Sequence, residues 1–399
     1  MPDISYQERK SPHRILLGPG PSNVHPRVQQ AMTEPLLGYM DPCLFTVLDD
    51  IMKLLRFLFR TENELTFPIS ATGMAGMDAS FGNFLEPGDT AVIGTNGFFG
   101  ERMVDIALRY GANVIRLNAE WGRIIEPEVI EAALKSQKKV KLLALVHAET
   151  STGVLQPLTE ASRLAKQYGA LFLVDAVTSL GGHELAVDDW GIDICYSGSQ
   201  KCISCPPGLA PFTANQTALD TLKTRKCNVP SFYLDLSLLA KYWLANGSRT
   251  YHHTAPACMF YALHEALALI AEEGLEARIQ RHLRHGAALH AGLEAMGLTL
   301  HAQPGHRLST LTTVRIPSGI DDLRIRQRLL NEFAIEIGGG LGTLKGQAWR
   351  VGLMGHSSTE ENVLLFLSAL EKLLIEEGYS LEAGAGVNAA TENLKKKKA

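Results

Sequence analysis

The 399-residue sequence contains few cysteines, and its six cysteines are spread from position 43 to position 258. So few thiols in so long a chain argue against a disulfide framework and favour a reducing, cytoplasmic-type compartment. The one Cys-x-x-C pair is Cys202 and Cys205, and no second pair or histidine spacing completes a four-ligand zinc site. The next residues, Pro206 and Pro207, prevent the regular helix of a thioredoxin-like site. We therefore expect no metal, and we interpret both cysteines as small buried hydrophobic residues.

Strong charge and long apolar runs are also missing. The formal net charge is only −4, so the composition gives no reason to expect nucleic acid or an anionic membrane as a partner. No apolar run approaches the roughly 20 residues that span a bilayer. The N-terminus lacks the apolar stretch of a secretory signal, and the C-terminal KKKKA differs from the Ser-Lys-Leu peroxisomal address. We expect a cytoplasmic protein, and leave another organelle open.

Short apolar runs alternate with helical stretches up to about residue 258. Helices are expected near residues 42–60 and 126–137, and residues 13–28 are too rich in proline for a regular element. Strands that alternate with helices of about 10–15 residues predict a mainly parallel sheet covered on both faces. The expected strands are the runs LTFPIS, TAVIG, NVIRLN, VKLLALVHAE, ALFLVDAV, DICYSGS and LAPFTA.

After residue 258 the pattern changes to a smaller α+β unit. One long helical segment over residues 259–297 comes first, followed by strand, helix, strand, strand and helix. The expected fold class is therefore α/β. We expect an N-terminal extension over residues 1–20, a large cofactor-binding domain over 21–260, a small C-terminal domain over 261–380 and a flexible tail over 381–399.

Ligands of open α/β sheets bind beyond the carboxyl ends of the strands, and three such ends carry distinctive groups. LTFPIS leads into the turn SATGMAG, residues 70–76, which opens a helix and so offers bare N–H groups to a phosphate. Asp175 ends the run ALFLV, where a carboxylate is costly unless a buried cation, such as a protonated pyridine, pairs with it. Lys201 follows DICYSGSQ, and a lysine near a buried strand end suits covalent binding of an aldehyde.

Each of these features alone has an ordinary structural explanation: a tight turn, a capping aspartate or a lysine that reaches the surface. Together they match one cofactor, because pyridoxal phosphate needs a lysine for its aldehyde, a carboxylate for its ring nitrogen and a seat for its phosphate. One crossover and one strand separate Asp175 from Lys201, which predicts that both lie on the same rim of the sheet. The sequence thus predicts a pyridoxal-phosphate enzyme with Lys201 and Asp175 as catalytic residues.

Longer motifs follow one another from residue 15 to about residue 375, among them LLGPGPSNVHPRV, SATGMAGMDA, ETSTGVLQPL, LVDAVTSLGG, YSGSQKCISCPPG, YHHTAP and WRVGLMGHSSTEENV. On these motifs the chain resembles the class V aminotransferases of fold type I, most closely the alanine–glyoxylate (serine–pyruvate) type. The resemblance implies a large domain with a mainly parallel seven-stranded sheet, a smaller C-terminal α+β domain, and a homodimer with shared active sites. It also implies transfer of an amino group from alanine or serine to glyoxylate by a ping-pong mechanism, with amino acids and 2-oxo acids as substrates.

Carried over residue by residue, the resemblance assigns most of the site. Lys201 would bind the aldehyde covalently, Asp175 would pair with the ring nitrogen, and Arg350 would bind the substrate carboxylate, which a guanidinium holds at two points. Tyr251 and Thr254 would reach the cofactor phosphate from the second subunit. The other expected cofactor contacts are Thr72, with Gly73, Met74 and Gln200 at the phosphate, Phe99 and Val177 on the two ring faces, and Thr150 at the ring hydroxyl.

Two positions depart from the pattern usual in the animal enzymes: Phe99 stands where tryptophan is common, and Met74 where histidine is common. Both bear on substrate preference, so a serine–glyoxylate or 2-aminoethylphosphonate–pyruvate aminotransferase stays open. A cysteine desulfurase is less supported, since no cysteine follows Cys258. A dinucleotide-binding oxidoreductase would need G-x-G-x-x-G after the first strand, and GPGPS is not that motif. A catalytically silent binding protein would have no need of Lys201, Asp175 and Arg350 together.

Overall fold

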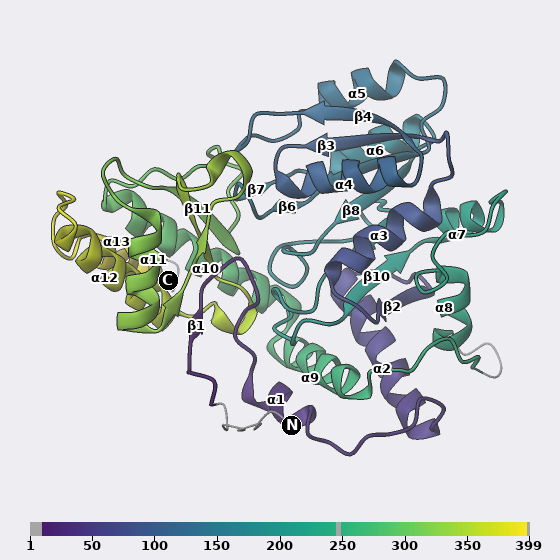
Figure 1. Cartoon of the computed structure of the whole chain (residues 1–399), viewed down its shortest axis with the longest axis horizontal. Helices are drawn as coiled ribbons and strands as arrows, with labels where there is room; N and C mark the ends of the chain where they lie inside the picture. Colours follow the sequence, from purple (N-terminus) through teal and green to yellow (C-terminus); the bar gives the residue numbers. More distant parts are fainter. Residues whose placement is uncertain (1–9, 245–248, 397–399) are drawn as a thin grey trace, which may run out of the picture.

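The computed structural model describes residues 10–244 and 249–396, which form two lobes (Figure 1). The larger lobe contains a seven-stranded sheet, and the smaller lobe contains a three-stranded sheet from the C-terminal part of the chain. Each lobe has a hydrophobic core. One core extends in sequence from Val28 to Ile279, and the other joins Leu17 to residues after Ala288.

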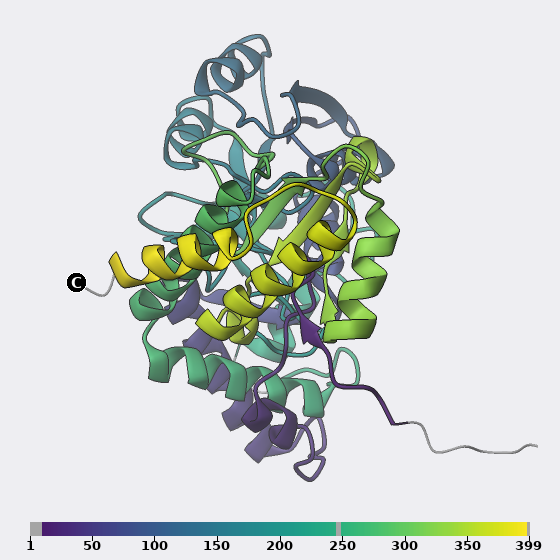
Figure 2. The ribbon, with the colours of Figure 1, turned by 90° about the vertical axis from the view of Figure 1, so that its left-hand side faces the viewer.

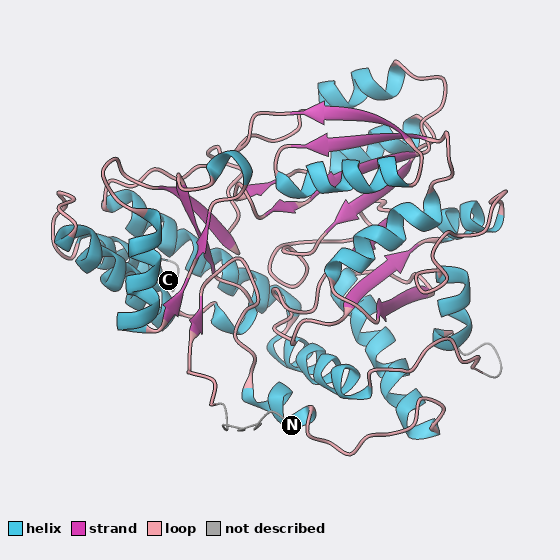
Figure 3. Ribbon diagram, viewed as in Figure 1, coloured by secondary structure: helices cyan, strands magenta, loops and turns pink. Residues whose placement is uncertain are grey.

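The large sheet has the strand order β2-β10-β9-β8-β5-β3-β4. β10 runs antiparallel to both of its neighbours, and the other pairings are parallel. The mainly parallel sheet predicted from the alternation is therefore confirmed, and helices cover both of its faces (Figure 3). The strands are β2 (Leu65–Ile69), β3 (Thr90–Thr95), β4 (Asn113–Asn118), β5 (Leu142–Val146), β8 (Leu171–Asp175), β9 (Ile194–Tyr196) and β10 (Ala210–Ala214).

Helix α2 (Pro42–Phe59) shows how the sequence specifies one of these elements. The Asp41 side chain caps it by accepting a hydrogen bond from the N–H of Cys43, and Pro42 occupies the first turn, where its missing N–H costs nothing. Arg60, in the left-handed conformation, ends the helix, so the prediction over residues 42–60 is confirmed. The buried stripe consists of Leu44, Leu48, Ile51, Leu55 and Leu58, spaced at helical intervals.

The crossover helices begin close to the carboxyl ends of the strands, so their N-termini face the same edge of the sheet. α3 begins four residues after β2 ends, and α4 begins three residues after β3 ends. This edge is where a ligand is expected. The helices of the large lobe besides α2 are α1 (Pro26–Ala31), α3 (Gly73–Phe84), α4 (Phe98–Arg109), α5 (Pro127–Lys135), α6 (Thr159–Gln167), α7 (Gln216–Lys223), α8 (Leu236–Trp243) and α9 (Ala257–Glu273).

The small lobe combines an antiparallel sheet with helices. Its strands β11 (Leu311–Arg315), β14 (Ala348–Gly352) and β13 (Gly338–Gly339) pair in that order. The N-terminal segment joins this lobe, because β1 (Ile15–Leu16) pairs in parallel with β12 (Ile335–Glu336). The helices are α10 (Leu275–Ala295), α11 (Asp322–Phe333), α12 (Glu360–Glu376) and α13 (Ala385–Lys396), with short 3-10 turns η1 (Gly342–Leu344) and η2 (Gly355–Ser357).

The single long helix expected over residues 259–297 is two helices, α9 and α10. Gly274 separates them with a φ of +84°, a conformation that side chains rarely adopt and that ends a helix. α9 contributes to the core of the large lobe, whereas Leu289 and Leu293 of α10 lie in the core of the small lobe. We propose that the boundary between the domains lies at this break rather than at residue 260.

Within the stretch 381–399, for which a flexible tail is expected, residues Ala385–Lys396 form helix α13. This helix packs against α10 (Figure 2), with Ala390 and Leu394 almost fully buried. Ala390 and Leu394 are four residues apart and so lie on one face of the helix. The lysine run over residues 395–398 follows this face directly, and it is the reason to expect an exposed tail. In the part of the chain that the structure describes, no helix is both long and apolar enough to cross a bilayer.

Candidate active site

The three predicted strand ends meet at one cavity of about 220 Å³ at the carboxyl edge of the large sheet. Asp175 is the last residue of β8, Lys201 lies in the loop after β9, and the turn after β2 opens α3. The sequence argument about a common rim is therefore confirmed. The predicted residues that line the cavity are Thr72, Gly73, Met74, Phe99, Thr150, Asp175, Val177, Gln200 and Lys201.

Asp175 is a buried carboxylate with both oxygens hydrogen-bonded. The N–H of Val177 donates to Oδ1 and the phenol of Tyr196 donates to Oδ2, each at 2.8 Å. Burial raises the pKa of Asp175 to about 6, although these two bonds and the charge of Lys201 lower it. A cationic partner in the cavity would hold the carboxylate ionised, so the site fits a protonated ring nitrogen.

Lys201 is a half-buried residue that lines the same cavity as Asp175. Its Nζ donates a hydrogen bond to the carbonyl of Pro19. Burial, together with the nearby charge of Arg350, lowers the pKa of Lys201 to about 8. A substantial share of the amine is thus neutral near physiological pH, and the neutral amine is the form that attacks an aldehyde.

The N-terminus of α3 has the features of a seat for an anion. Its N-cap, Thr72, makes no side-chain capping bond, so the first N–H groups, those of Gly73 and Met74, point without a capping partner toward the cavity edge. Two polar atoms close by, Ser70 Oγ and Gln200 Oε1, are buried without a hydrogen-bond partner in the described residues. Unsatisfied groups of this kind fit a phosphate, with the Gln200 amide turned so that its NH₂ donates.

Glu149 was not predicted from the sequence, but it lies next to Thr150 in the chain and is hydrogen-bonded to Phe99, two of the predicted cofactor contacts. It ends β6 (Ala148–Glu149), which pairs with β7 (Val154–Leu155). It is fully buried, and it accepts hydrogen bonds from the N–H of Phe99 at 3.1 Å and from the Ser151 hydroxyl at 2.6 Å. It therefore caps α4 from outside and fixes Phe99 beside Thr150. The available signal was a carboxylate three residues after the buried strand β5, similar to the signal that identified Asp175.

Arg350 reaches the site from β14 of the small lobe. It is 8% exposed, and its Nε donates to the carbonyl of Gly339 at 2.8 Å. Within the described residues its two terminal nitrogens make no hydrogen bond and no ion pair with a carboxylate. Burial lowers the pKa of Arg350 to about 10, partly offset by the charge of Glu149. A buried guanidinium with two free nitrogens can bind a substrate carboxylate.

Tyr251 and Thr254 lie outside the cavity of their own chain. Tyr251 is 51% exposed and its ring lies 4.7 Å from that of Tyr39, and Thr254 is exposed too. Their contact with a second subunit's cofactor stays a prediction.

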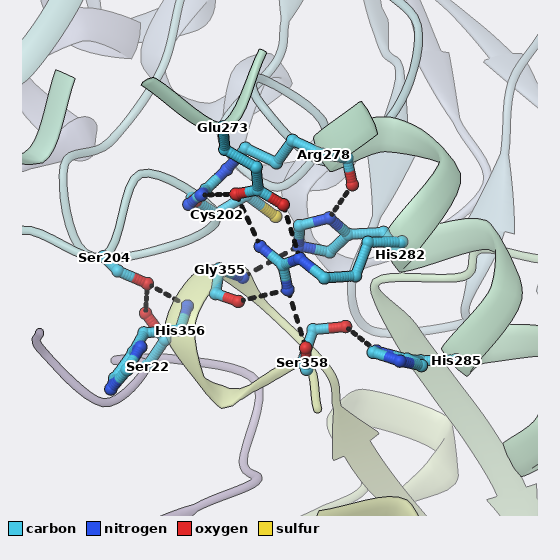
Figure 4. Close-up of polar contacts among 11 residues, drawn as sticks. Ser22, Cys202, Ser204, Glu273, Arg278, His282, His285, Gly355, His356 and Ser358 are labelled. Carbon is cyan, nitrogen blue, oxygen red and sulfur yellow. Dashed lines mark hydrogen bonds and ion pairs between the residues drawn. The ribbon is translucent and has the colours of Figure 1, made fainter. Parts of the chain in front are cut away.

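The backbone that follows Lys201 is held by the C-terminal part of the chain (Figure 4). Arg278 on α10 donates from Nη2 to the carbonyl of Cys202 at 2.6 Å. Ser204 accepts a hydrogen bond from the N–H of His356 at 2.8 Å, although its own φ of +58° is unusual for a residue with a side chain. The loop that positions Lys201 is thus fixed by residues that are more than 70 positions away.

The two cysteines of the Cys-x-x-C pair are buried, with free thiols. The thiol of Cys202 donates to the carbonyl of Thr178 at 3.3 Å, and burial raises its pKa to about 12. Burial also raises the pKa of Cys205. In the described residues no group of three or more His, Cys, Asp or Glu side chains could hold a metal ion.

Comparisons with known proteins agree with this geometry. The sequence profile of the family described as Aminotransferase class-V matches residues 56–366. The chain is 41% identical to the (S)-ureidoglycine–glyoxylate transaminase of Bacillus subtilis, over 97% of this chain and 96% of that protein. It is 44% identical to the alanine–glyoxylate aminotransferase of Callithrix jacchus, over 91% of this chain and 88% of that protein. The crystal structure of the alanine–glyoxylate aminotransferase of Nostoc sp. superposes with a TM-score of 0.91 at 48% identity, covering 93% of this chain and 98% of that one.

Proposed function

The chain belongs to the class V aminotransferases, which are pyridoxal-phosphate enzymes, and from this premise we propose that it transfers the amino group of alanine or serine to glyoxylate. The observation that carries the proposal is the convergence of Lys201, Asp175 and Arg350, because a transaminase needs an amine for the aldehyde, a carboxylate for the ring and a cation for the substrate. Both kinds of close relative are named for glyoxylate, which supports it as the acceptor. Family membership excludes the oxidoreductase alternative.

The cofactor, when bound, supplies a protonated ring that withdraws electrons from the α-carbon of the substrate and so makes its C–H bond acidic. The residues of the chain bind the cofactor and the substrate and transfer the proton. Lys201 would hold the cofactor through its aldehyde, and the free amine of Lys201 would take up the proton that leaves the α-carbon of the substrate and return it to the cofactor. Asp175 keeps the ring nitrogen protonated. Thr72, Gly73, Met74 and Gln200 seat the phosphate, Phe99 and Val177 enclose the ring, and Thr150 donates to the ring hydroxyl.

Arg350 orients the substrate in this scheme. Its bond to Gly339 fixes the plane of the guanidinium and leaves two parallel N–H donors for a carboxylate. An amino acid held in this way presents its α-carbon to the cavity that Lys201 lines. Because amino acids and 2-oxo acids share the carboxylate, the same contact serves both halves of a ping-pong reaction.

We also propose a homodimer in which Tyr251 and Thr254 of one subunit complete the phosphate seat of the other. The exposure of both side chains at a distance from their own cavity supports this arrangement. A cytoplasmic location stays a prediction from the sequence.

A second candidate is transfer from ureidoglycine, since the Bacillus subtilis relative is named for that donor and covers 97% of this chain. The experiment is a comparison of kcat/KM for alanine, serine and ureidoglycine with glyoxylate as acceptor, and for 2-aminoethylphosphonate with pyruvate as acceptor. We expect alanine or serine to exceed the other donors at least tenfold. A preference for ureidoglycine would select the second candidate, and no transfer to glyoxylate from any donor would overturn both.

A further inference from the structure

Tyr196 and Asp175 are direct neighbours across two parallel strands. The register of β8 and β9 pairs their Cα atoms, and paired residues project from the same face of a sheet. The phenol O–H of Tyr196 donates to Asp175 Oδ2 at 2.8 Å, and both side chains line the 220 Å³ cavity. Tyr196 thus belongs to the site, although no pattern in the sequence assigns it a role.

Packing fixes the ring of Tyr196 without help from its hydroxyl. The side chain is fully buried, and a Cβ added to Gly76 of α3 would lie 2.9 Å from the Tyr196 Cβ, so the helix lies directly against it. A phenylalanine would fill the same space. A buried hydroxyl adds a desolvation cost unless it is hydrogen-bonded, and the partner of this one is Asp175. The hydrogen bond to the Asp175 carboxylate therefore explains why a tyrosine, and not a phenylalanine, is found at position 196.

We propose that Tyr196 is a positioning residue that keeps Asp175 oriented and ionised, so that the proton between Asp175 and the cofactor's ring nitrogen stays on the nitrogen. The proposal rests on the role given to Asp175 in the proposed function. Without the phenol O–H, the proton moves from the ring N–H to a carboxylate oxygen and leaves both groups neutral. A neutral ring is a weaker electron acceptor, so the step at the α-carbon slows.

The surroundings of Asp175 determine whether loss of the Tyr196 hydroxyl raises or lowers the pKa of Asp175. Burial favours the neutral carboxyl and raises its pKa to about 6, whereas the N–H of Val177 and the O–H of Tyr196 favour the carboxylate. Removing the O–H leaves burial less opposed, so the pKa of Asp175 must rise further. The phenol itself stays protonated, because burial raises the pKa of Tyr196. The other titratable groups that interact with Asp175 are Lys201, Glu149 and Cys195.

The deciding experiment titrates Asp175 in the apoprotein. Carboxyl-¹³C aspartate is incorporated, and the Asp175 signal is assigned by its loss in Asp175→Asn. We expect Tyr196→Phe to raise the titration midpoint by about one to two pH units, on the scale of one hydrogen bond to a charged group. The matched control is Tyr110→Phe, which removes another tyrosine–aspartate bond, from Tyr110 to Asp78 at 3.1 Å, away from the cavity. It should leave the Asp175 midpoint unchanged.

The holoenzyme separates this proposal from the proposed function. With ¹⁵N-pyridoxal phosphate, the ring nitrogen signal should be at the protonated position in the wild type and at the neutral position in Asp175→Asn. If Asp175→Asn keeps a protonated ring, the role of Asp175 in the proposed function is wrong. If Asp175→Asn loses that proton but the apoprotein of Tyr196→Phe, with a normal melting temperature, titrates at the wild-type midpoint, the proposal for Tyr196 alone is overturned.

Discussion

The amine of Lys201 donates a hydrogen bond to the main-chain carbonyl of Pro19, which lies near the opposite end of the sequence from Arg350. The same N-terminal segment is bonded to the small lobe, since the N–H of Gly352 donates to the carbonyl of Leu17 at 2.7 Å. The segment therefore contacts both Lys201 and the strand that carries Arg350.

Gly20→Ala is expected to disturb the contact between the N-terminal segment and Lys201. A Cβ at Gly20 would lie 2.5 Å from Lys201 Nζ, and the φ of +111° is one that side chains rarely adopt. Strain alone should lower the free energy of unfolding by about 1–3 kcal/mol, and the displaced amine should lower kcat. The control, Gly319→Ala, has a φ of +86° but no neighbour within 4 Å. It should lose stability and keep kcat, and equal kcat values in the two variants would contradict the contact.

Lys201→Ala should abolish turnover, because no other amine in the described cavity can bind the aldehyde. The wild-type protein should be yellow, and borohydride should bleach its visible band and attach the cofactor to the peptide that contains Lys201. Lys166→Ala, at an exposed lysine, is the control and should behave as wild type. A Lys201→Ala protein with normal turnover would remove the basis of the assignment.

Arg350→Lys should raise KM for amino and oxo substrates alike by about 10- to 100-fold, because a single ammonium replaces a two-pronged contact worth about 1.5–3 kcal/mol. Cofactor absorbance should stay nearly unchanged. Arg315→Lys, on the neighbouring strand β11, is the matched control. Unchanged KM values in Arg350→Lys would show that another residue binds the carboxylate.

The buried Lys201 makes the stability of the apoprotein depend on pH. Burial lowers its pKa from 10.5 to about 8, so between these values the unfolded chain binds a proton that the folded chain lacks, and the free energy of unfolding rises with pH. Below about pH 8 the Lys201 amine is protonated in both the folded and the unfolded state, and the full free-energy cost of burying its charge lowers the stability of the folded protein. Lys201→Met should therefore be more stable than wild type at pH 7, by up to about 3 kcal/mol. Urea unfolding measures the difference, which should shrink from pH 8 to pH 10.5; a constant difference would contradict the lowered pKa.

A shared active site can be tested by complementation. Lys201→Ala is mixed with a Tyr251→Phe, Thr254→Ala double variant that binds cofactor weakly. A mixed dimer should regain one intact site, with Lys201 from one subunit and Tyr251 and Thr254 from the other. If subunit exchange is demonstrated and neither activity nor cofactor affinity recovers, the two residues serve only their own chain.

Local patterns in the sequence were enough to predict the frame of the site. A strand covered on both faces must be apolar along its length, so its end is visible as the first polar group after the run. Parallel strands place such ends on one edge. Asp175 and Lys201 could therefore be found, and brought together, without coordinates. The N-terminus of α3 was visible for the same reason, because glycines and small residues mark the turn that precedes it.

Contacts across the fold could not be predicted in this way. The bond from Tyr196 to Asp175 depends on the register of two strands, and the bond from Phe99 to Glu149 depends on how the start of α4 meets the end of β6. Arg350 lay on a recognisable strand, but only the docking of the small lobe brings it beside Lys201. Periodicity reports which face of an element is buried and not what it is buried against, since that choice is made by packing between segments far apart in the chain. Local patterns along the chain were therefore enough for most of the large-lobe elements and for the chemistry at their ends, whereas packing between distant segments selects which of those groups touch.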